Sequence, residues 1–146
     1  MASPELKTLL AHDEARGVFW LKSHAAVSEI KAAAKARNWA FFHLEGEKIE
    51  KKEQFFNHAA MAMKFPSHFG HNWDAFYDCL TEFDGVDADG YLIYFDHTDA
   101  FSEHHESQLE TAIELFEDAI DFWKEDGKSM LVLLSGSTPP PGIAKV

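Results

Sequence analysis

Two aspartates spaced four residues apart, Asp74 and Asp78, are the side chains whose placement in this sequence most suggests chemistry. They fall in a segment that is expected to form a helix over residues 73–83, with Asn72 as a natural N-cap. At about 100° per residue, both carboxylates lie on the polar side of that helix. The opposite, apolar side is made by Trp73, Phe76, Cys79, Leu80 and Phe83. Like charges at this spacing repel within a helix, so a pair kept at that cost hints at a role in binding.

Charge is distributed unevenly along the 146 residues. The chain has 25 acidic and 13 basic residues, for a formal net charge of −12, and residues 65–123 contain fifteen acids with no Lys or Arg. Such a segment is either a solvated surface that favours solubility or a field that attracts a basic partner. Direct binding of nucleic acid is not expected, because phosphate recognition needs clustered Lys and Arg.

Nine histidines raise the question of a metal site. His68 and His71 lie three residues apart, and residues 103–106 read Glu-His-His-Glu. Consecutive side chains point in different directions, and no HExxH or comparable spacing is present, so we expect surface or structural histidines and no bound metal. On a binding loop, protonation of His68 or His71 would make the affinity for a partner depend on pH.

Catalytic motifs are equally scarce. Residues 96–99 (Asp-His-Thr-Asp) follow an expected strand, where parallel α/β sheets usually bind ligands. No GxSxG, P-loop or GxGxxG motif accompanies them, so we interpret this segment as a polar loop. Cys79, the single cysteine, lies beside acids that would raise the pKa of its thiol, which argues against a nucleophilic role. The sequence therefore predicts neither an enzyme nor a cofactor.

The elements that must position these residues alternate between strands and helices. Apolar runs predict strands at residues 17–21, 40–44, 91–95 and 130–134. Helical spacing predicts helices at about residues 25–37, 51–64, 73–83 and 107–123, the last beginning at a capping box formed by Ser107 and Glu110. This alternation implies an α/β protein with a small parallel sheet of three or four strands covered by helices.

The length fits a single domain spanning residues 1–146. We expect a frayed N-terminus over 1–16, an added strand and helix over 17–39, a core over 40–135, and a Pro-rich tail over 136–146 that does not continue the sheet. The first residues lack the apolar run of a signal peptide, and no stretch is long and apolar enough to cross a membrane. A cytoplasmic location is therefore expected.

The run from Phe65 to Thr81, FPSHFGHNWDAFYDCLT, resembles the motif of the barstar family of ribonuclease inhibitors. The matching features are a proline, an aromatic residue followed by glycine, Asn-x-Asp-Ala, and an aromatic-Asp-Cys-Leu run at the family's spacing. The similarity extends more thinly over residues 40–135, and it implies a barstar-like fold for that core.

The resemblance implies a binding site on the helix and its preceding loop. In this family an aspartate matching Asp78 takes the place of the scissile phosphate of RNA and pairs with the catalytic Arg and His of the nuclease. A carboxylate suits this role because it accepts strong bidentate hydrogen bonds from arginine. Asp74 matches a second acidic contact, and Asp118 falls where the later helix of the family carries another. The other contacts that the resemblance implies are His68, Phe69, Gly70, Asn72, Trp73, Tyr77 and Thr81.

We therefore expect an intracellular inhibitor, of the antitoxin or immunity type, that blocks a basic ribonuclease. The sequence departs from the family pattern at His68, His71 and Tyr77, as expected of an inhibitor directed at a different nuclease. Two alternatives remain open. One is a barstar-fold binding or regulatory protein for another basic partner, and the other is a metal-dependent hydrolase.

Overall fold

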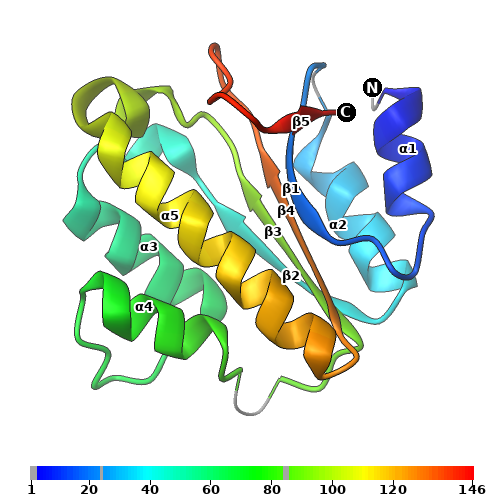
Figure 1. The fold of residues 1–146 in the computed structure, drawn as a ribbon, viewed down its shortest axis with the longest axis horizontal. Helices are drawn as coiled ribbons and strands as arrows, with labels where there is room; N and C mark the ends of the chain where they lie inside the picture. Colours follow the sequence, from blue (N-terminus) through cyan, green and yellow to red (C-terminus); the bar gives the residue numbers. More distant parts are fainter. Residues whose placement is uncertain (1–2, 24, 84–85) are drawn as a thin grey trace.

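The computed structural model describes residues 3–23, 25–83 and 86–146, without the side chains of residues 103–107. Its centre is a sheet of five parallel strands in the order β2-β3-β4-β1-β5 (Figure 1). The strands are β1 (Gly17–Trp20), β2 (Trp39–Leu44), β3 (Gly90–Phe95), β4 (Ser129–Leu134) and β5 (Ala144–Lys145). The parallel α/β fold that the sequence predicts is confirmed.

Helices cover both faces of the sheet (Figure 1). The helices are α1 (Pro4–Leu10), α2 (Val27–Ala36), α3 (Lys52–Met63), α4 (Trp73–Leu80) and α5 (Asp99–Glu125), with a 3-10 turn η1 (Gly46–Lys48) after β2. Helices α1 and α2 pack on one face, and α3, α4 and α5 pack on the other. Each face of the sheet therefore contributes to its own apolar layer.

Alternate residues of β3 divide between these two layers. Tyr91, Ile93 and Phe95 join the core under α3, α4 and α5, whereas Leu92 and Tyr94 join the core under α1 and α2. Every residue of β3 is buried, which explains why the strand is apolar throughout rather than alternating with polar residues.

An aromatic cluster around Phe55 connects α3 to the neighbouring elements. The fully buried Phe55 ring stacks on Phe101 of α5, with ring centroids 5.4 Å apart and an interplanar angle of 9°. It meets Phe76 of α4 edge-on at 5.1 Å and Phe95 of β3 at 5.6 Å. Such pairs contribute about 0.5–1.5 kcal/mol each beyond their burial, so this ring helps to fix the position of α4 over the sheet.

Helix α5 begins earlier than the sequence predicts. The capping box at Ser107 and Glu110 indicates a start at residue 107, whereas Ser107 lies inside α5. Phe101 supplies the reason, because its full burial against Phe55 extends the apolar stripe of α5 toward its N-terminus. The Asp99 carboxylate, in the first turn, accepts a hydrogen bond from the backbone N–H of Ser137 at 2.7 Å.

Residues 4–10 form helix α1, so the prediction of a frayed segment over 1–16 is wrong for this part of the chain. Ser3 caps the helix by accepting a hydrogen bond from the Leu6 N–H at 3.1 Å, and Pro4 occupies the first turn. Leu6 and Leu10 are buried in the same apolar layer as Ile30 of α2. Their spacing of four residues places them on one face of α1, which makes burial against α2 possible.

The Pro-rich tail returns to the sheet, which corrects the prediction that it does not. Strand β5 follows the prolines at 139–141 and pairs with β1. The Val146 N–H donates to the carbonyl of Trp20 at 2.8 Å, and the Lys22 N–H donates to the carbonyl of Val146 at 3.0 Å. The prolines precede the paired residues, where no ladder hydrogen bond is needed. The sheet therefore has five strands instead of the expected three or four.

Replacing Phe55 by alanine is expected to lower the free energy of unfolding by about 3–5 kcal/mol, because it leaves a cavity where α3, α4, α5 and β3 meet. Urea denaturation measures this change. Met61 on the same helix is 78% exposed, so Met61→Ala is the matched control and should change stability by less than about 0.5 kcal/mol. Equal effects of the two substitutions would contradict the central role of Phe55.

Candidate functional site

Helix α4 begins where the sequence predicts, at the Asn72 cap. The Asn72 side-chain oxygen accepts a hydrogen bond from the Ala75 N–H at 2.8 Å, and its amide donates to the carbonyl of Gly70 at 3.2 Å. The oxygen and the nitrogen of this side-chain amide are therefore both hydrogen-bonded to the protein's own backbone. Asn72, an expected partner contact, serves here to join the loop to the helix.

Two tryptophans connect α4 to α5. The indole N–H of Trp123, on α5, donates to the carbonyl of Leu80 at 2.8 Å, in the last turn of α4. The half-buried Trp73, in the first turn of α4, donates its indole N–H to the side-chain oxygen of Gln108 on α5 at 3.0 Å. Because these bonds lie at opposite ends of α4, they oppose rotation of the helix about its axis.

The resulting orientation directs the two aspartates outward. Phe76 and Leu80 are fully buried on the inner side of α4, while Asp74 and Asp78 are exposed on the outer side. The expected apolar side is confirmed, although Trp73 and Cys79 at its edges are only partly buried. Thr81 is partly buried beyond the last turn, and its hydroxyl donates to the carbonyl of Tyr77 at 3.0 Å.

Acidic residues of α4 and α5 converge on Tyr77. The pKa of the Tyr77 phenol is raised, first by partial burial and then by the negative charges of Asp118, Asp78 and Asp121. The structure thus brings Tyr77 and Asp78 of α4 close to Asp118 of α5, all three of which are expected contacts. Asp121 was not among those contacts, and its position three residues after Asp118 on the same helix face was the available signal.

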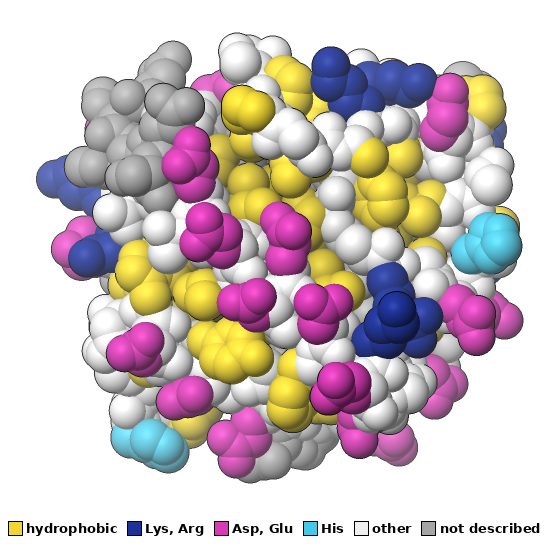
Figure 2. Space-filling model, in the orientation of Figure 1, with side chains coloured by type: hydrophobic (Ala, Val, Ile, Leu, Met, Phe, Trp, Pro, Cys, Tyr) yellow, Lys and Arg dark blue, Asp and Glu magenta, His cyan; other side chains and the backbone are white. Residues whose placement is uncertain are grey.

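None of these carboxylates forms an ion pair among the residues that the structure describes. The ion pairs found there join residues of other elements, and none includes Asp74, Asp78, Asp118 or Asp121. Figure 2 shows carboxylates spread over the face formed by α4 and α5, with apolar side chains between them. Within the described part of the chain, no ion pair offsets the negative charge of these four carboxylates.

The loop before α4 has an inner and an outer set of residues. Phe69 is buried and contacts Phe65 at 5.1 Å, so this expected contact residue supports the loop from below. His71 adopts a left-handed backbone with φ 51°, and its ring nitrogens lie 3.0 Å from the carbonyl of Phe69 and 3.0 Å from the side-chain oxygen of Asn57 on α3. His68 and Gly70 are exposed, so these two residues face outward.

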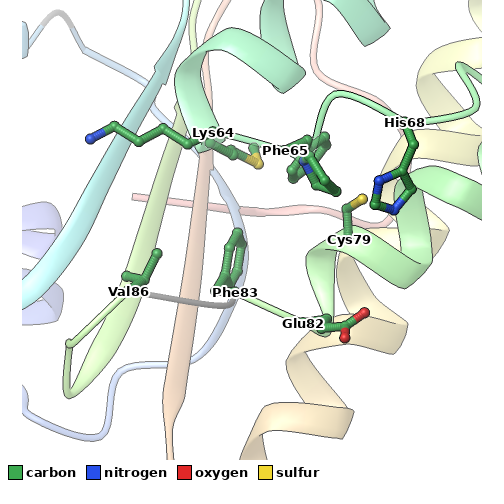
Figure 3. A pocket seen from close by; sticks show the side chains of 9 residues that line it. Lys64, Phe65, His68, Cys79, Glu82, Phe83 and Val86 are labelled. Carbon is green, nitrogen blue, oxygen red and sulfur yellow. The ribbon is translucent and has the colours of Figure 1, made fainter.

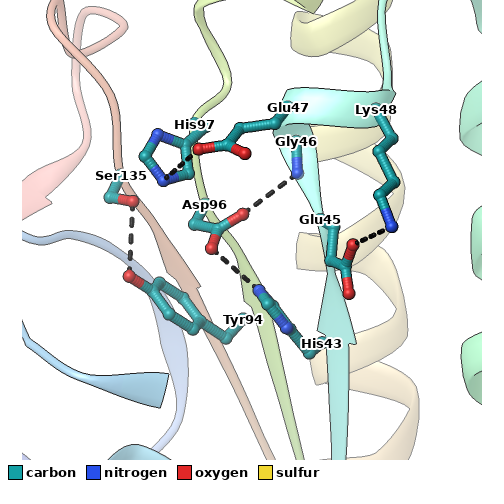
Figure 4. Close-up of polar contacts among 9 residues, drawn as sticks. All are labelled: His43, Glu45, Gly46, Glu47, Lys48, Tyr94, Asp96, His97 and Ser135. Carbon is teal, nitrogen blue, oxygen red and sulfur yellow. Dashed lines mark hydrogen bonds and ion pairs between the residues drawn. The ribbon is translucent and has the colours of Figure 1, made fainter.

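A second polar group lies at the carboxyl ends of β2 and β3 (Figure 4). The buried Asp96 carboxylate lies 2.8 Å from Nε2 of His43 and accepts a hydrogen bond from the Gly46 N–H at 3.0 Å. A Cβ at Gly46 would lie 1.8 Å from the carbonyl oxygen of Asp96, so only glycine fits there. The Tyr94 ring stacks on His43 at 5.6 Å. These contacts hold strand ends together, and sequence reasoning did not find the His43–Asp96 pair.

Metal-binding and membrane-spanning features are absent where the structure can be described. Among the residues that the structure describes, no group of three or more His, Cys, Asp or Glu residues is arranged to hold a metal ion. The side chains of residues 103–106, the Glu-His-His-Glu run, lie outside the described part. Within the same limits, no helix has the length and apolar character needed to span a membrane.

The protein is thus a parallel α/β domain whose α4 and α5 present exposed carboxylates. A family model described as Barstar (barnase inhibitor) matches residues 39–135, and the chain belongs to the barstar family. This confirms the family that residues 65–81 indicate. The match runs from β2 to the end of β4, so it includes α4 and α5 but not α1, β1, α2 or β5. A search of curated proteins found no significant match.

Replacing Asn72 by alanine is expected to lower the free energy of unfolding by about 1 kcal/mol, because the Ala75 N–H loses its cap. Thermal or urea denaturation measures the loss. Asn72→Asp keeps an acceptor oxygen at the same position and should retain most of the stability. An alanine variant as stable as the wild type would show that the cap does not hold the start of α4.

Replacing Asp118 by asparagine is expected to lower the pKa of Tyr77. The carboxylate disfavours the phenolate, so removing its charge lets the phenol ionise at a lower pH than in the wild type. NMR titration of the Tyr77 Cζ resonance measures this shift. Glu110→Gln removes a charge elsewhere on α5 and should leave the titration unchanged. If the pKa of Tyr77 is the same in Asp118→Asn as in the wild type, the convergence of the two helices on Tyr77 is contradicted.

Proposed function

We propose that this protein inhibits a basic ribonuclease by covering its active site with α4, the preceding loop and the adjacent side of α5. The observation that carries the proposal is Asp78, an exposed carboxylate on a helix held at both ends. Among the described residues, Asp78 takes part in no ion pair. Membership of a family described as barnase inhibitors supports the same conclusion.

Asp78 supplies the central contact in this proposal. A ribonuclease binds the phosphate of RNA with positively charged groups, and a carboxylate accepts the same charge-assisted hydrogen bonds from arginine. Asp74, one turn earlier, and Asp118, on α5 near Tyr77, add negative charge around it. The protein would thus present to the nuclease a pattern of charge that resembles its substrate.

The other residues expected to contact the partner fall into two groups, those exposed to a partner and those that hold the loop and α4 in place. His68, Gly70, Trp73, Tyr77 and Thr81 are at least partly exposed around Asp74 and Asp78, where a partner would touch them. Phe69 and Asn72 support the site instead, because Phe69 is buried and Asn72 caps α4. The shape of the loop therefore depends on the buried ring of Phe69 and on the hydrogen bonds of the exposed Asn72 side chain.

The charge distribution supports a basic partner. Residues 65–123 contain no Lys or Arg, and they include both α4 and most of α5. A surface of one sign accelerates association with a partner of the opposite sign and repels RNA itself. We place the inhibitor in the cytoplasm of the cell that makes the nuclease, where RNA would otherwise be degraded. The proposed activity needs no cofactor, no metal and no catalytic step.

Titration of RNA cleavage tests the proposed function. Barnase and the secreted or toxin-type ribonucleases of the source organism serve as probes, each mixed with increasing amounts of the protein. We expect the wild type to suppress cleavage by its cognate enzyme at near-equal molar amounts. Asp78→Asn should weaken inhibition at least about a hundredfold, because it leaves the buried cationic groups of the nuclease unpaired.

The control is Glu29→Gln, which removes one negative charge from the exposed surface of α2 in the other layer. It should inhibit like the wild type. The proposal fails if the wild type suppresses none of these enzymes, or if Asp78→Asn inhibits equally well. Tight binding of a basic protein without ribonuclease activity would instead favour a regulatory barstar-fold protein with another partner.

A further inference from the structure

A pocket lies on the flank of α4 that faces away from α5. It has a volume of about 260 Å³ and opens between α4 and the loop that follows α3 (Figure 3). Phe65, Phe83 and Val86 provide apolar walls, and Cys79 contributes its side chain from α4. The pocket is therefore a partly apolar hollow beside the exposed face of α4.

The side of the pocket formed by α4 carries a negative charge. Glu82 is exposed and lines the pocket one turn beyond Asp78. Lys64 also lines the pocket, but in Figure 3 its chain extends away from Glu82, so the two charges do not meet. In the described part of the chain, Glu82 takes part in no ion pair, and it belongs to no group of three metal-binding side chains. Its carboxylate is available to a group that enters from outside.

The pocket is continuous with the proposed nuclease-binding face. His68 belongs to both, because it lies on the exposed loop and also lines the pocket beside Cys79. The negative charges of Asp78 and Glu82 both contribute, after burial, to raising the pKa of the Cys79 thiol. Asp78 also contributes to raising the pKa of Tyr77, so its charge acts both on the side of α4 near Asp118 and on this pocket.

We propose that this pocket receives an arginine or lysine side chain of the bound ribonuclease, whose cationic end pairs with Glu82. The inference rests on the proposed function and extends its interface beyond Asp78. The chemistry of the pocket matches such a side chain, because its methylene stem can lie against Phe65, Phe83 and Val86. Its charged end then reaches a carboxylate at the rim and forms a charge-assisted hydrogen bond.

Cys79 provides a direct test because it is the only cysteine in the sequence. Its rate of alkylation by iodoacetamide is measured at one pH, first in the protein alone and then in its complex with a ribonuclease that it inhibits, barnase being tried first. If a side chain fills the pocket, alkylation in the complex should slow by at least about tenfold, since thiol reactivity depends on access. Suppressed RNA cleavage with alkylation at the unbound rate would overturn the inference.

Glu82→Gln provides a second test, with Glu29→Gln as a control of equal charge change. The inhibition constant should rise about tenfold for Glu82→Gln and remain unchanged for the control, with equal unfolding free energies in urea. If Asp78→Asn weakens inhibition as expected and Glu82→Gln inhibits like the wild type, the pocket proposal fails and the proposed function stands. If the wild type inhibits no ribonuclease, both proposals fail.

Discussion

The burial of the apolar side of α4 determines which side chains of this helix face the solvent. Phe76 and Leu80 are fully enclosed, and the Phe55 ring contacts Phe76 from α3. With its apolar side fixed in this way, an eight-residue helix has one remaining side for solvent, and that side carries Asp74 and Asp78. The aromatic core is therefore the physical cause of the acidic surface, although the two share no residue.

The carboxyl edge of the sheet is used differently from that of many α/β proteins. Ligands commonly bind there, yet in this protein its polar groups bond mainly to one another. Asp96 joins His43 and Gly46, and Asp99 binds the backbone of Ser137. These bonds tie the strand ends, η1, the start of α5 and the tail together. The proposed binding surface lies instead on the outer sides of α4 and α5, which cover one face of the sheet.

The sequence pattern predicts correctly those features that depend on interactions between residues close together in the chain. The apolar runs of β3 and β4, the Asn72 cap and the outward side of α4 all follow from residues close together in the chain. The early start of α5 and the pairing of β5 depend on contacts with distant residues, Phe101 with Phe55 and Val146 with Trp20. The same distinction applies to the site. Periodicity predicts the exposure of Asp78, but the approach of Asp121 to Tyr77 and the inward turn of Phe69 arise only from packing.

The hydrogen bonds at the two ends of α4 have a thermodynamic consequence for association. A helix of this length is only marginally stable in isolation, because the free energy gained by propagating about two turns does not offset the free energy of nucleation. Asn72 at one end and the Trp123 N–H at the other keep it formed before any partner arrives. The conformational entropy of ordering α4 is thus lost during folding, and a partner that binds α4 does not have to offset that loss. More of the contact energy then remains as affinity, and the encounter with a partner need not wait for a rearrangement.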